Sequence, residues 1–303
     1  MRLFSEFDIQ FDLPAPTAMI AMLHLHPSLD VLQVKPESVL IEHVDASSTT
    51  TLTPAVYLDS FGNRCSRFLA PAGAIRLSGQ SMLEMPAEPD PWMPGLTQAP
   101  VEELPPEVLQ FLLASRYCQV DQMIAIANDL FGYTTPGWPR ATFIRDWVHD
   151  HVAFNYKTAR STKTALDVFT ERVGVCRDFQ HLAITLSRAM NIPARYVTGY
   201  LGDIRHHYSG PGDFSAWYEV FLGGRWWTMD ARHNNSRYGR VLMATGRDAT
   251  DVAITTSFGI ANLTHFYVES NEVDEAGVKL PVPPSPTALP TMVPAGLAEP
   301  AAS

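Results

Sequence analysis

The chain has 303 residues, which suits two domains or one domain with a large extension, and its 46% hydrophobic content is typical of a globular protein. A net charge of −10 argues against a nucleic-acid or anionic-membrane binder, because such proteins carry a basic stripe. The N-terminal segment has no apolar stretch of the signal-peptide type, and no run of about 18 apolar residues follows it. We therefore expect no signal peptide and no membrane-spanning helix.

The three cysteines, Cys65, Cys118 and Cys176, are far apart in the sequence. Their number and spacing fit neither a disulfide framework nor a zinc site. No phosphate-binding glycine loop, nucleotide fingerprint or calcium loop is present either. The sequence therefore predicts reduced thiols, a cytoplasmic location, and neither a metal nor another cofactor.

Residues 1–85 are predicted to form a β-sandwich domain. Residues 7–12 alternate between apolar and polar side chains, and residues 31–34 and 39–44 are apolar runs of strand length. Turn signals bound these runs at 35–36, 45–48 and 59–63. A proline-rich segment follows at 86–106, which we interpret as a linker.

The pattern becomes helical after the linker. Residues 107–116, 119–131 and 141–152 carry apolar side chains at helical spacing, and 154–157 form a short extended piece. A central helix is expected after Gly174, and strands are expected from there to about residue 270. We predict one core over 107–270 and a disordered Pro/Ala-rich tail over 271–303.

Cys176 lies at the predicted start of this central helix, within Gly174-Val175-Cys176-Arg177-Asp178-Phe179-Gln180-His181-Leu182-Ala183. A thiol there experiences the positive end of the helix dipole, which lowers its pKa and enriches the thiolate. Backbone N–H groups of the first turn also suit the stabilisation of an oxyanion. The alternative is a buried cysteine of the core with no chemical role.

This segment resembles the bacterial transglutaminase-like family, and so do residues 192–200, Ala216-Trp217-Tyr218-Glu219-Val220 and Trp227-Thr228-Met229-Asp230. The resemblance covers about residues 105–265. It implies an α+β fold with a papain-like core, in which a helix that bears the cysteine packs on an antiparallel sheet. Members of the family hydrolyse peptide amides or transfer acyl groups from them, often from Gln side chains, with a Cys-His-Asp triad.

By this resemblance Cys176 is the nucleophile and Asp230 orients the base. The residue before Ala216-Trp217 is normally the catalytic His, and here it is Ser215. The Gly-Gly turn at 223–224 predicts a hairpin in which Leu222 pairs with Arg225. If both strands continue, Trp217 faces Asp230, Ser215 faces Arg232, and all four share one face of the sheet. Ser215 and Asp230 are then diagonal neighbours at about 7–8 Å.

Several residues have two interpretations. Arg232 either pairs with Asp230 in a structural ion pair or stabilises the Cys176 thiolate or a substrate carboxylate. Trp217 belongs either to the core or to a substrate platform, and Tyr156 is a candidate for lining the cleft. His206 and His207 lie in the loop before Ser215, where they either replace the missing imidazole or belong to a solvated polar segment.

Three functions remain open from the sequence. The first is an active cysteine enzyme that forms a Cys176 thioester with peptide or activated acyl substrates. Because the His that would protonate a leaving amine is replaced, activated esters and thioesters are expected to react better than amides. The second is a catalytically silent module that binds a peptide or protein. The third is a structural protein with a vestigial cleft. None of the three predicts a nucleic-acid or membrane partner.

Overall fold

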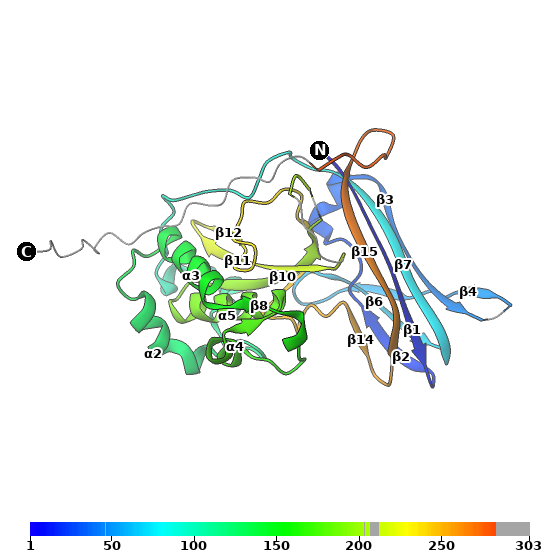
Figure 1. Cartoon of the computed structure of the whole chain (residues 1–303), viewed down its shortest axis with the longest axis horizontal. Helices are drawn as coiled ribbons and strands as arrows, with labels where there is room; N and C mark the ends of the chain where they lie inside the picture. The colour runs from blue at the N-terminus through cyan, green and yellow to red at the C-terminus, as the bar shows by residue number, and fades with distance from the viewer. Residues whose placement is uncertain (46, 203, 207–211, 283–303) are drawn as a thin grey trace, which may run out of the picture. The chain divides into compact units, whose positions relative to one another are not determined.

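The computed structural model describes residues 1–45, 47–202, 204–206 and 212–282. The chain divides into two compact units (Figure 1). Unit 1 comprises Met1–Asp90, Tyr196–Ala216 and the described part of Ser236–Pro286. Unit 2 comprises Pro91–Arg195 and Trp217–Asn235. The chain passes from one unit to the other within strands β10 (Ala194–Tyr200) and β11 (Ser215–Leu222).

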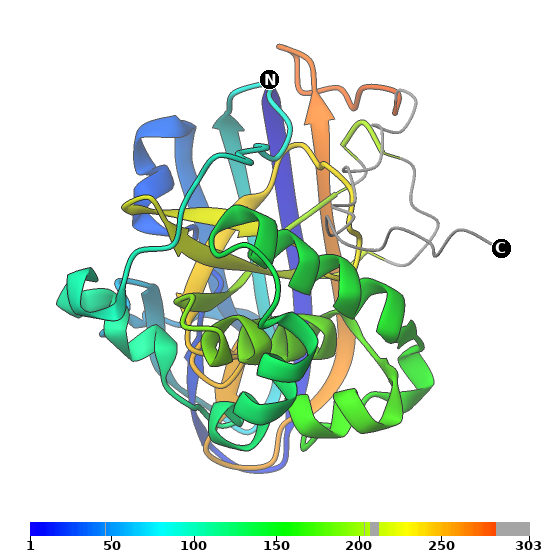
Figure 2. The ribbon, with the colours of Figure 1, turned by 90° about the vertical axis from the view of Figure 1, so that its left-hand side faces the viewer.

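Unit 1 contains two antiparallel sheets. The larger has the strand order β15-β1-β7-β3-β4, and Figure 2 shows β1 between β15 and β7. The smaller has the order β14-β2-β6-β5. Strands β10 and β13 also pair in this unit, between Tyr196–Tyr200 and Val241–Gly246. The remaining bounds are β1 Arg2–Leu13, β2 Thr17–Ala21, η1 Pro27–Leu32, β3 Gln33–Val44, β4 Thr49–Thr51, β5 Ala55–Leu58, β6 Arg64–Ala70, β7 Gly73–Glu84, β14 Thr255–Ser257 and β15 Asn262–Val273.

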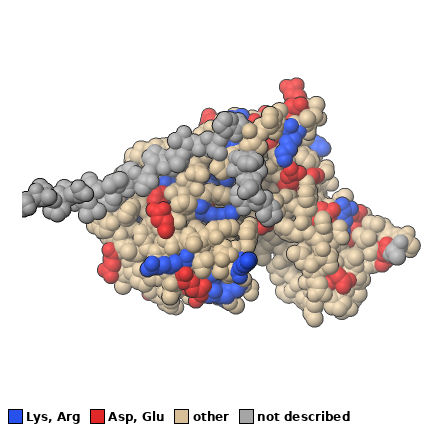
Figure 3. Space-filling model, viewed as in Figure 1, with Lys and Arg blue, Asp and Glu red and all other residues tan. Residues whose placement is uncertain are grey.

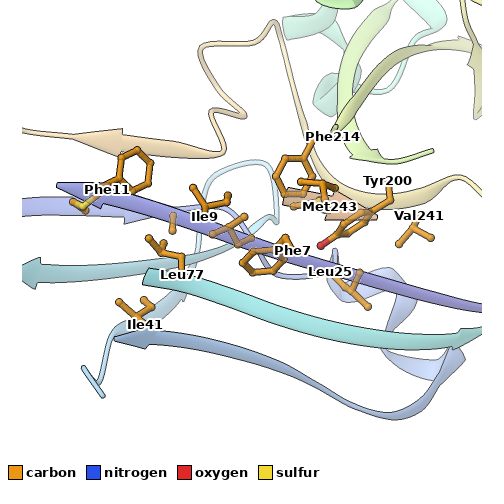
Figure 4. Close-up of a cluster of buried hydrophobic side chains, with 14 of the residues drawn as sticks. Phe7, Ile9, Phe11, Leu25, Ile41, Leu77, Tyr200, Phe214, Val241 and Met243 are labelled. Atoms are coloured by element: carbon orange, nitrogen blue, oxygen red, sulfur yellow. The ribbon is translucent and has the colours of Figure 1, made fainter. Parts of the chain in front are cut away.

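The two sheets of unit 1 bury their inner faces in one hydrophobic core. Alternate residues of β1 are buried, as its period-two pattern predicts. Figure 4 shows Phe7 and Ile9 of β1 close to Tyr200 and Phe214, with Leu77 of β7 beside them. The core cluster contains residues of both sheets, which confirms the predicted sandwich.

This sandwich is not built from the N-terminal segment alone. Strand β15 pairs with β1 along almost its whole length, from Arg2↔Val273 to Asp12↔Asn262. Strand β14 pairs with β2. The observed division therefore differs from the expected contiguous domains 1–85 and 107–270, because late strands complete both sheets of unit 1. Long-range strand pairing of this kind leaves no local signal in the sequence.

Two local predictions also differ from the structure. The turn expected at Lys35-Pro36 is absent, and β3 runs through these residues with irregular register against β7. A proline is tolerated there because a bulged pairing does not need its missing N–H group. In the expected tail, residues 271–273 belong to β15, and Val273 bridges to Lys279. Residues 283–303 lie outside the described part of the chain.

Unit 2 contains the predicted helices around a central helix, α5. All three helical predictions before Gly174 correspond to observed elements, although the first is divided into α1 and η3. Nearly every residue of α5 after its first two is buried, as befits a central element. The bounds are η2 Val101–Glu103, α1 Pro106–Leu109, η3 Gln110–Leu112, α2 Val120–Phe131, α3 Trp138–His151, β8 Ala153–Phe154, η4 Tyr156–Thr158, α4 Ala165–Glu171, β9 Val173–Gly174, α5 Cys176–Ala189 and β12 Arg225–Met229.

The proline-rich segment 86–106 is largely irregular, as a linker should be, but it is held at several points. Within unit 1, the Asp90 carboxylate accepts hydrogen bonds from Arg240 Nε at 3.0 Å. Within unit 2, the Leu96 carbonyl accepts from Trp138 N–H, and Gln98 Nε2 donates to the Met190 carbonyl, both at 2.9 Å. This segment is therefore part of the folded structure.

Candidate active site

Cys176 is the first residue of α5 and is half-buried. The preceding residues Val173–Gly174 form β9, which pairs in parallel with β8. The chain thus changes directly from a short strand to a helix at the cysteine. No disulfide joins any of the three cysteines among the described residues, and Cys65 and Cys118 are both buried. Cys176 is therefore the cysteine with access to a substrate.

Asp178 fixes the start of α5. Its Oδ2 accepts the N–H of Val175 at 3.0 Å, which is a hydrogen bond of the N-terminal capping kind. Burial raises the pKa of the Asp178 carboxyl, and the bonds from Val175 and Arg177 counteract this. Gly174 leaves space for this carboxylate, because a Cβ at that position would lie 2.6 Å from Asp178 Cβ. Asp178 therefore holds the first turn of α5, which begins at Cys176.

Gln180 connects the cysteine helix to Asp230. Residues 176 and 180 are four apart and therefore lie on the same side of α5. Gln180 Nε2 donates to Asp230 Oδ1 at 3.1 Å, and Gln180 Oε1 accepts the Ala231 N–H at 3.3 Å. The sequence-based prediction did not include Gln180, although its spacing from Cys176 was a usable signal. These bonds bring Asp230 to the side of the helix that carries the thiol.

Asp230 is buried and directly follows β12. Its Oδ1 also accepts the N–H groups of Arg232 at 3.0 Å and His233 at 3.1 Å. The Asn234 N–H in turn bonds the Asp230 carbonyl at 3.1 Å. An aspartate that receives N–H groups two and three residues later forms the turn motif that ends a strand. Asp230 thus has a structural task besides any chemical one.

The predicted hairpin register is confirmed, but the strands are shorter than expected. Leu222 pairs with Arg225, and the ladder ends at Tyr218↔Met229. The expected pairs of Trp217 with Asp230 and of Ser215 with Arg232 are therefore not rungs of this hairpin. The reason is the turn at Asp230, which takes the chain out of the sheet before Arg232.

Arg232 lies over an aromatic ring. Its guanidinium carbon is 4.0 Å from the ring centroid of Phe154 in β8. Phe154 pairs with Gly174, two residues before Cys176, and its ring meets Tyr156 edge-on at 4.9 Å. Phe154 is 38% exposed and Tyr156 is 44% exposed. The half-buried Arg232 and the exposed Phe154 and Tyr156 therefore form one ledge beside the strand that leads into Cys176.

The remaining predicted residues are more scattered. Trp217 is buried in unit 2, as a core residue would be. Ser215 is half-buried, opens β11, and lies on the unit 1 side of the division between Ala216 and Trp217. His206 also belongs to unit 1. His207 lies outside the described residues.

Two histidines of unit 2 receive clear places. His181 is fully buried and stacks on Tyr117, with ring centroids 4.8 Å apart, so its role is structural. His149 of α3 has its Nδ1 at 3.1 Å from the Ala231 carbonyl oxygen. Ala231 is thus held by Gln180 of α5 through its N–H and by His149 of α3 through its carbonyl. Two helices together fix the turn that begins at Asp230.

The described residues can be compared with the side-chain groups that hold metal ions and with the helices that cross membranes. Within them, His, Cys, Asp and Glu side chains form no group of three or more that is placed to hold a metal ion. None of their helices combines the length and the apolar content that a membrane span requires. The cytoplasmic location expected from the sequence stays a prediction.

Comparisons with known proteins agree with this fold. Residues 124–231, which contain Cys176, Ser215 and Asp230, match the model of the transglutaminase-like superfamily. A protein of Cytophaga hutchinsonii, whose crystal structure is described as that of a "putative cysteine protease", is 30% identical with a TM-score of 0.78, over 93% of this chain and 94% of that chain. The fold is that of a papain-like cysteine enzyme with a large β-rich unit. The chain belongs to the transglutaminase-like superfamily.

Two mycobacterial relatives are also similar. An uncharacterized protein of Mycobacterium leprae is 34% identical over 113 residues, which are 35% of this chain and 39% of that protein. An uncharacterized protein of Mycobacterium bovis is 27% identical over 216 residues, which are 64% of this chain and 68% of that protein. The chain thus matches about two fifths of the length of the first relative and two thirds of the second.

Proposed function

We propose that this protein is a cysteine-dependent hydrolase or acyltransferase in which Cys176 forms a thioester with the substrate. The proposal rests mainly on the position of Cys176, which is half-exposed at the start of α5. Gln180 lies one turn further on the same side of the helix and donates a hydrogen bond to Asp230. The helix start favours the thiolate and offers backbone N–H groups to an oxyanion. Asp230 is proposed to orient the group that serves as base.

The proposed reaction has two steps. The thiolate attacks the acyl carbonyl, a C–S bond forms, and the bond from the acyl carbon to the leaving group breaks. Water or an acceptor nucleophile then attacks the thioester and releases the thiol. Because Ser215 occupies the position of the family's His, we expect this site to catalyse the protonation of a leaving amine poorly. A general acid contributes about 10²–10⁴-fold to such a step.

Activated donors are therefore the proposed substrates of choice. Phenolate and thiolate leave without a proton, whereas an amine does not. Matched acyl donors that differ only in the leaving group, an aryl ester and an anilide, test this directly. We expect turnover of the ester that Cys176→Ala abolishes, and anilide hydrolysis that is slower by at least about 10². A Cys176-dependent preference for the anilide would overturn the proposal.

A silent binding module is the second candidate, and one observation favours it. Asp230 Oδ1 accepts three hydrogen bonds, from Gln180, Arg232 and His233. The two from backbone N–H groups form the turn and the one from Gln180 anchors it, so all three are explained by a structural role. If this is the function, Cys176 has the reactivity of an ordinary thiol. Iodoacetamide labelling as a function of pH, with Cys176→Ala as control, then gives a thiol pKa near 8.5 and the ester panel gives no turnover.

A further inference from the structure

The chain segment that leads into Cys176 is more basic than the chain as a whole. Residues 154–177 contain five basic and two acidic side chains, whereas the complete chain has a net charge of −10. Both acidic side chains are already bound: Arg160 pairs with Asp167 at 3.4 Å and with Glu171 at 2.6 Å, and Lys163 pairs with Glu171 at 3.0 Å. Figure 3 shows Lys and Arg side chains gathered on unit 2.

Three exposed cations near this segment have no carboxylate within ion-pair distance among the described residues: Arg116, Lys157 and Arg172. Arg116 lies 4.9 Å from the ring centroid of Tyr117, and Arg177, which follows the cysteine, lies 5.4 Å from the same centroid. Arg172 immediately precedes β9. Arg116 and Arg172 are therefore both connected to the segment that leads into Cys176.

Lys157 is connected to the same structure through Asn155. The Asn155 side chain accepts the Lys157 N–H at 3.0 Å, and the Asn155 N–H donates to the Gly174 carbonyl at 3.0 Å. The ledge of Arg232, Phe154 and Tyr156 lies beside this segment and presents a planar cation together with exposed aromatic rings. Guanidinium groups bind carboxylates with directed hydrogen bonds, and aromatic rings pack well against peptide groups.

We propose that the acyl donor of this enzyme is an acidic peptide segment, whose carboxylates bind the cations around Cys176: Arg116, Lys157, Arg172 and Arg232. This inference specifies the substrate class of the function proposed above and rests on that function. Charge complementarity selects the occupant, because surplus positive charge on an otherwise acidic protein attracts anionic partners to that place. The basic surface is short and interrupted by aromatic side chains, which suits a peptide better than the long basic stripe needed for a nucleic acid.

The first test measures the potential at the thiol without requiring catalysis. Iodoacetate and iodoacetamide alkylate a thiolate by the same displacement of iodide, but only iodoacetate carries a negative charge. At low ionic strength, we expect the iodoacetate-to-iodoacetamide rate ratio at Cys176 to exceed that of a neutral cysteine derivative by about two- to fivefold. Salt at about 1 M should remove the difference. A ratio equal to that of the reference thiol at every ionic strength would overturn the proposal.

Charge-reversal variants locate the effect. Lys157→Glu and Arg172→Glu should each lower the ratio about twofold, and the double variant should lower it further. Arg225→Glu is the matched control, because Arg225 is exposed and lies at the opposite end of β12 from Asp230. It changes the net charge equally and should leave the ratio within experimental error. An equal effect of all three substitutions would show that only the net charge matters.

The second test addresses binding and turnover. Two aryl-ester peptides with the same acyl group, one flanked by Glu and one by Lys, should differ in kcat/KM by about tenfold or more in favour of the acidic peptide, and Lys157→Glu/Arg172→Glu should reduce this preference. The unesterified acidic peptide should also protect Cys176 from iodoacetamide. Protection without turnover contradicts the proposed catalysis and leaves the acidic-peptide site standing. Equal protection by the basic peptide, by a polynucleotide or by phosphatidylserine vesicles would overturn the site.

Discussion

Gln180 Nε2 donates a hydrogen bond of 3.1 Å to Asp230 Oδ1, and both side chains are fully or nearly fully buried. Gln180 lies one helical turn after Cys176, so a single side chain joins the helix of the thiol to the carboxylate of the site. A hydrogen bond to a charged, buried carboxylate is worth about 1.5–3 kcal/mol. This bond is therefore strong enough to determine where the Asp230 turn lies.

Gln180→Ala tests the role of this bond. We expect the free energy of unfolding to fall by about 1.5–3 kcal/mol and kcat for an aryl ester to fall by about tenfold, because the Asp230 carboxylate loses its position. Thr185→Ala is the control, since it removes another buried hydrogen bond of α5, from the Thr185 hydroxyl to the His181 carbonyl. It should destabilise the protein but leave kcat unchanged. If both variants lose stability and neither loses kcat, Gln180 has no positioning role.

Ser215→His tests whether the rest of the site is intact. The sequence resemblance predicts that the family carries its catalytic His at this position, and a new imidazole there could protonate a leaving amine. We expect hydrolysis of the anilide substrate to increase by about 10²–10⁴, with a smaller change for the aryl ester. Ser215→Ala should show no gain, and Cys176→Ala/Ser215→His should be inactive. An anilide rate that stays at the wild-type value would mean that the change at 215 is not the missing element.

Gly174→Ala tests whether the close approach of residue 174 to the Asp178 side chain requires a glycine. The added Cβ would lie 2.6 Å from Asp178 Cβ and 2.9 Å from Asp178 Oδ2. We expect a loss of about 1–3 kcal/mol in the free energy of unfolding and slower alkylation of Cys176, because the helix start must shift. Gly95→Ala is the matched control, as a Cβ there meets no atom within 4 Å. Equal urea midpoints for the two variants would contradict this account.

The Glu171 ion pairs predict a defined dependence on pH. Hydrogen bonds from Arg160 and Lys163 lower the pKa of Glu171 from 4.5 to about 2. A carboxyl whose pKa is lower in the folded state contributes stability that is complete above its unfolded pKa and is lost as the pH falls toward the folded pKa. Glu171→Gln should therefore lower the urea midpoint at pH 7, and this difference should shrink as the pH falls below about 4.5. A difference that is constant between pH 7 and pH 3 would exclude the ionised Glu171 as its source.

The sequence predicted those parts of the structure that depend on local spacing. The start of α5 at Cys176, the register of the β11–β12 hairpin and three of the four α-helices before Gly174 follow from periodicity, turn residues and breakers. The strand end at Met229 could have been suspected, because Asp230 is a residue that forms turns with later N–H groups. Extending the strand past this residue produced the unsupported pairing of Ser215 with Arg232.

Other features of the structure cannot be predicted from the local sequence. The pairing of β15 with β1 joins residues at least 250 positions apart, and the hydrogen bond from His149 to Ala231 spans 82 positions. Nothing in the neighbourhood of either residue in the sequence specifies its partner. The position of Arg232 over Phe154 has the same character, since it depends on how the turn after β12 meets β8. Tertiary packing therefore decided these features.

The most direct test of the account is to trap the acyl group on Cys176. The protein is incubated with an aryl ester and quenched in acid, and the modified residue is located by peptide mass spectrometry. Cys65 serves as an internal control, because burial raises the pKa of its thiol to about 11. We predict one acyl group per chain on Cys176 and none in Cys176→Ala. The acyl group should be lost by hydrolysis of the thioester at neutral pH. Ester turnover that persists in Cys176→Ala, or acylation confined to other residues, would contradict it.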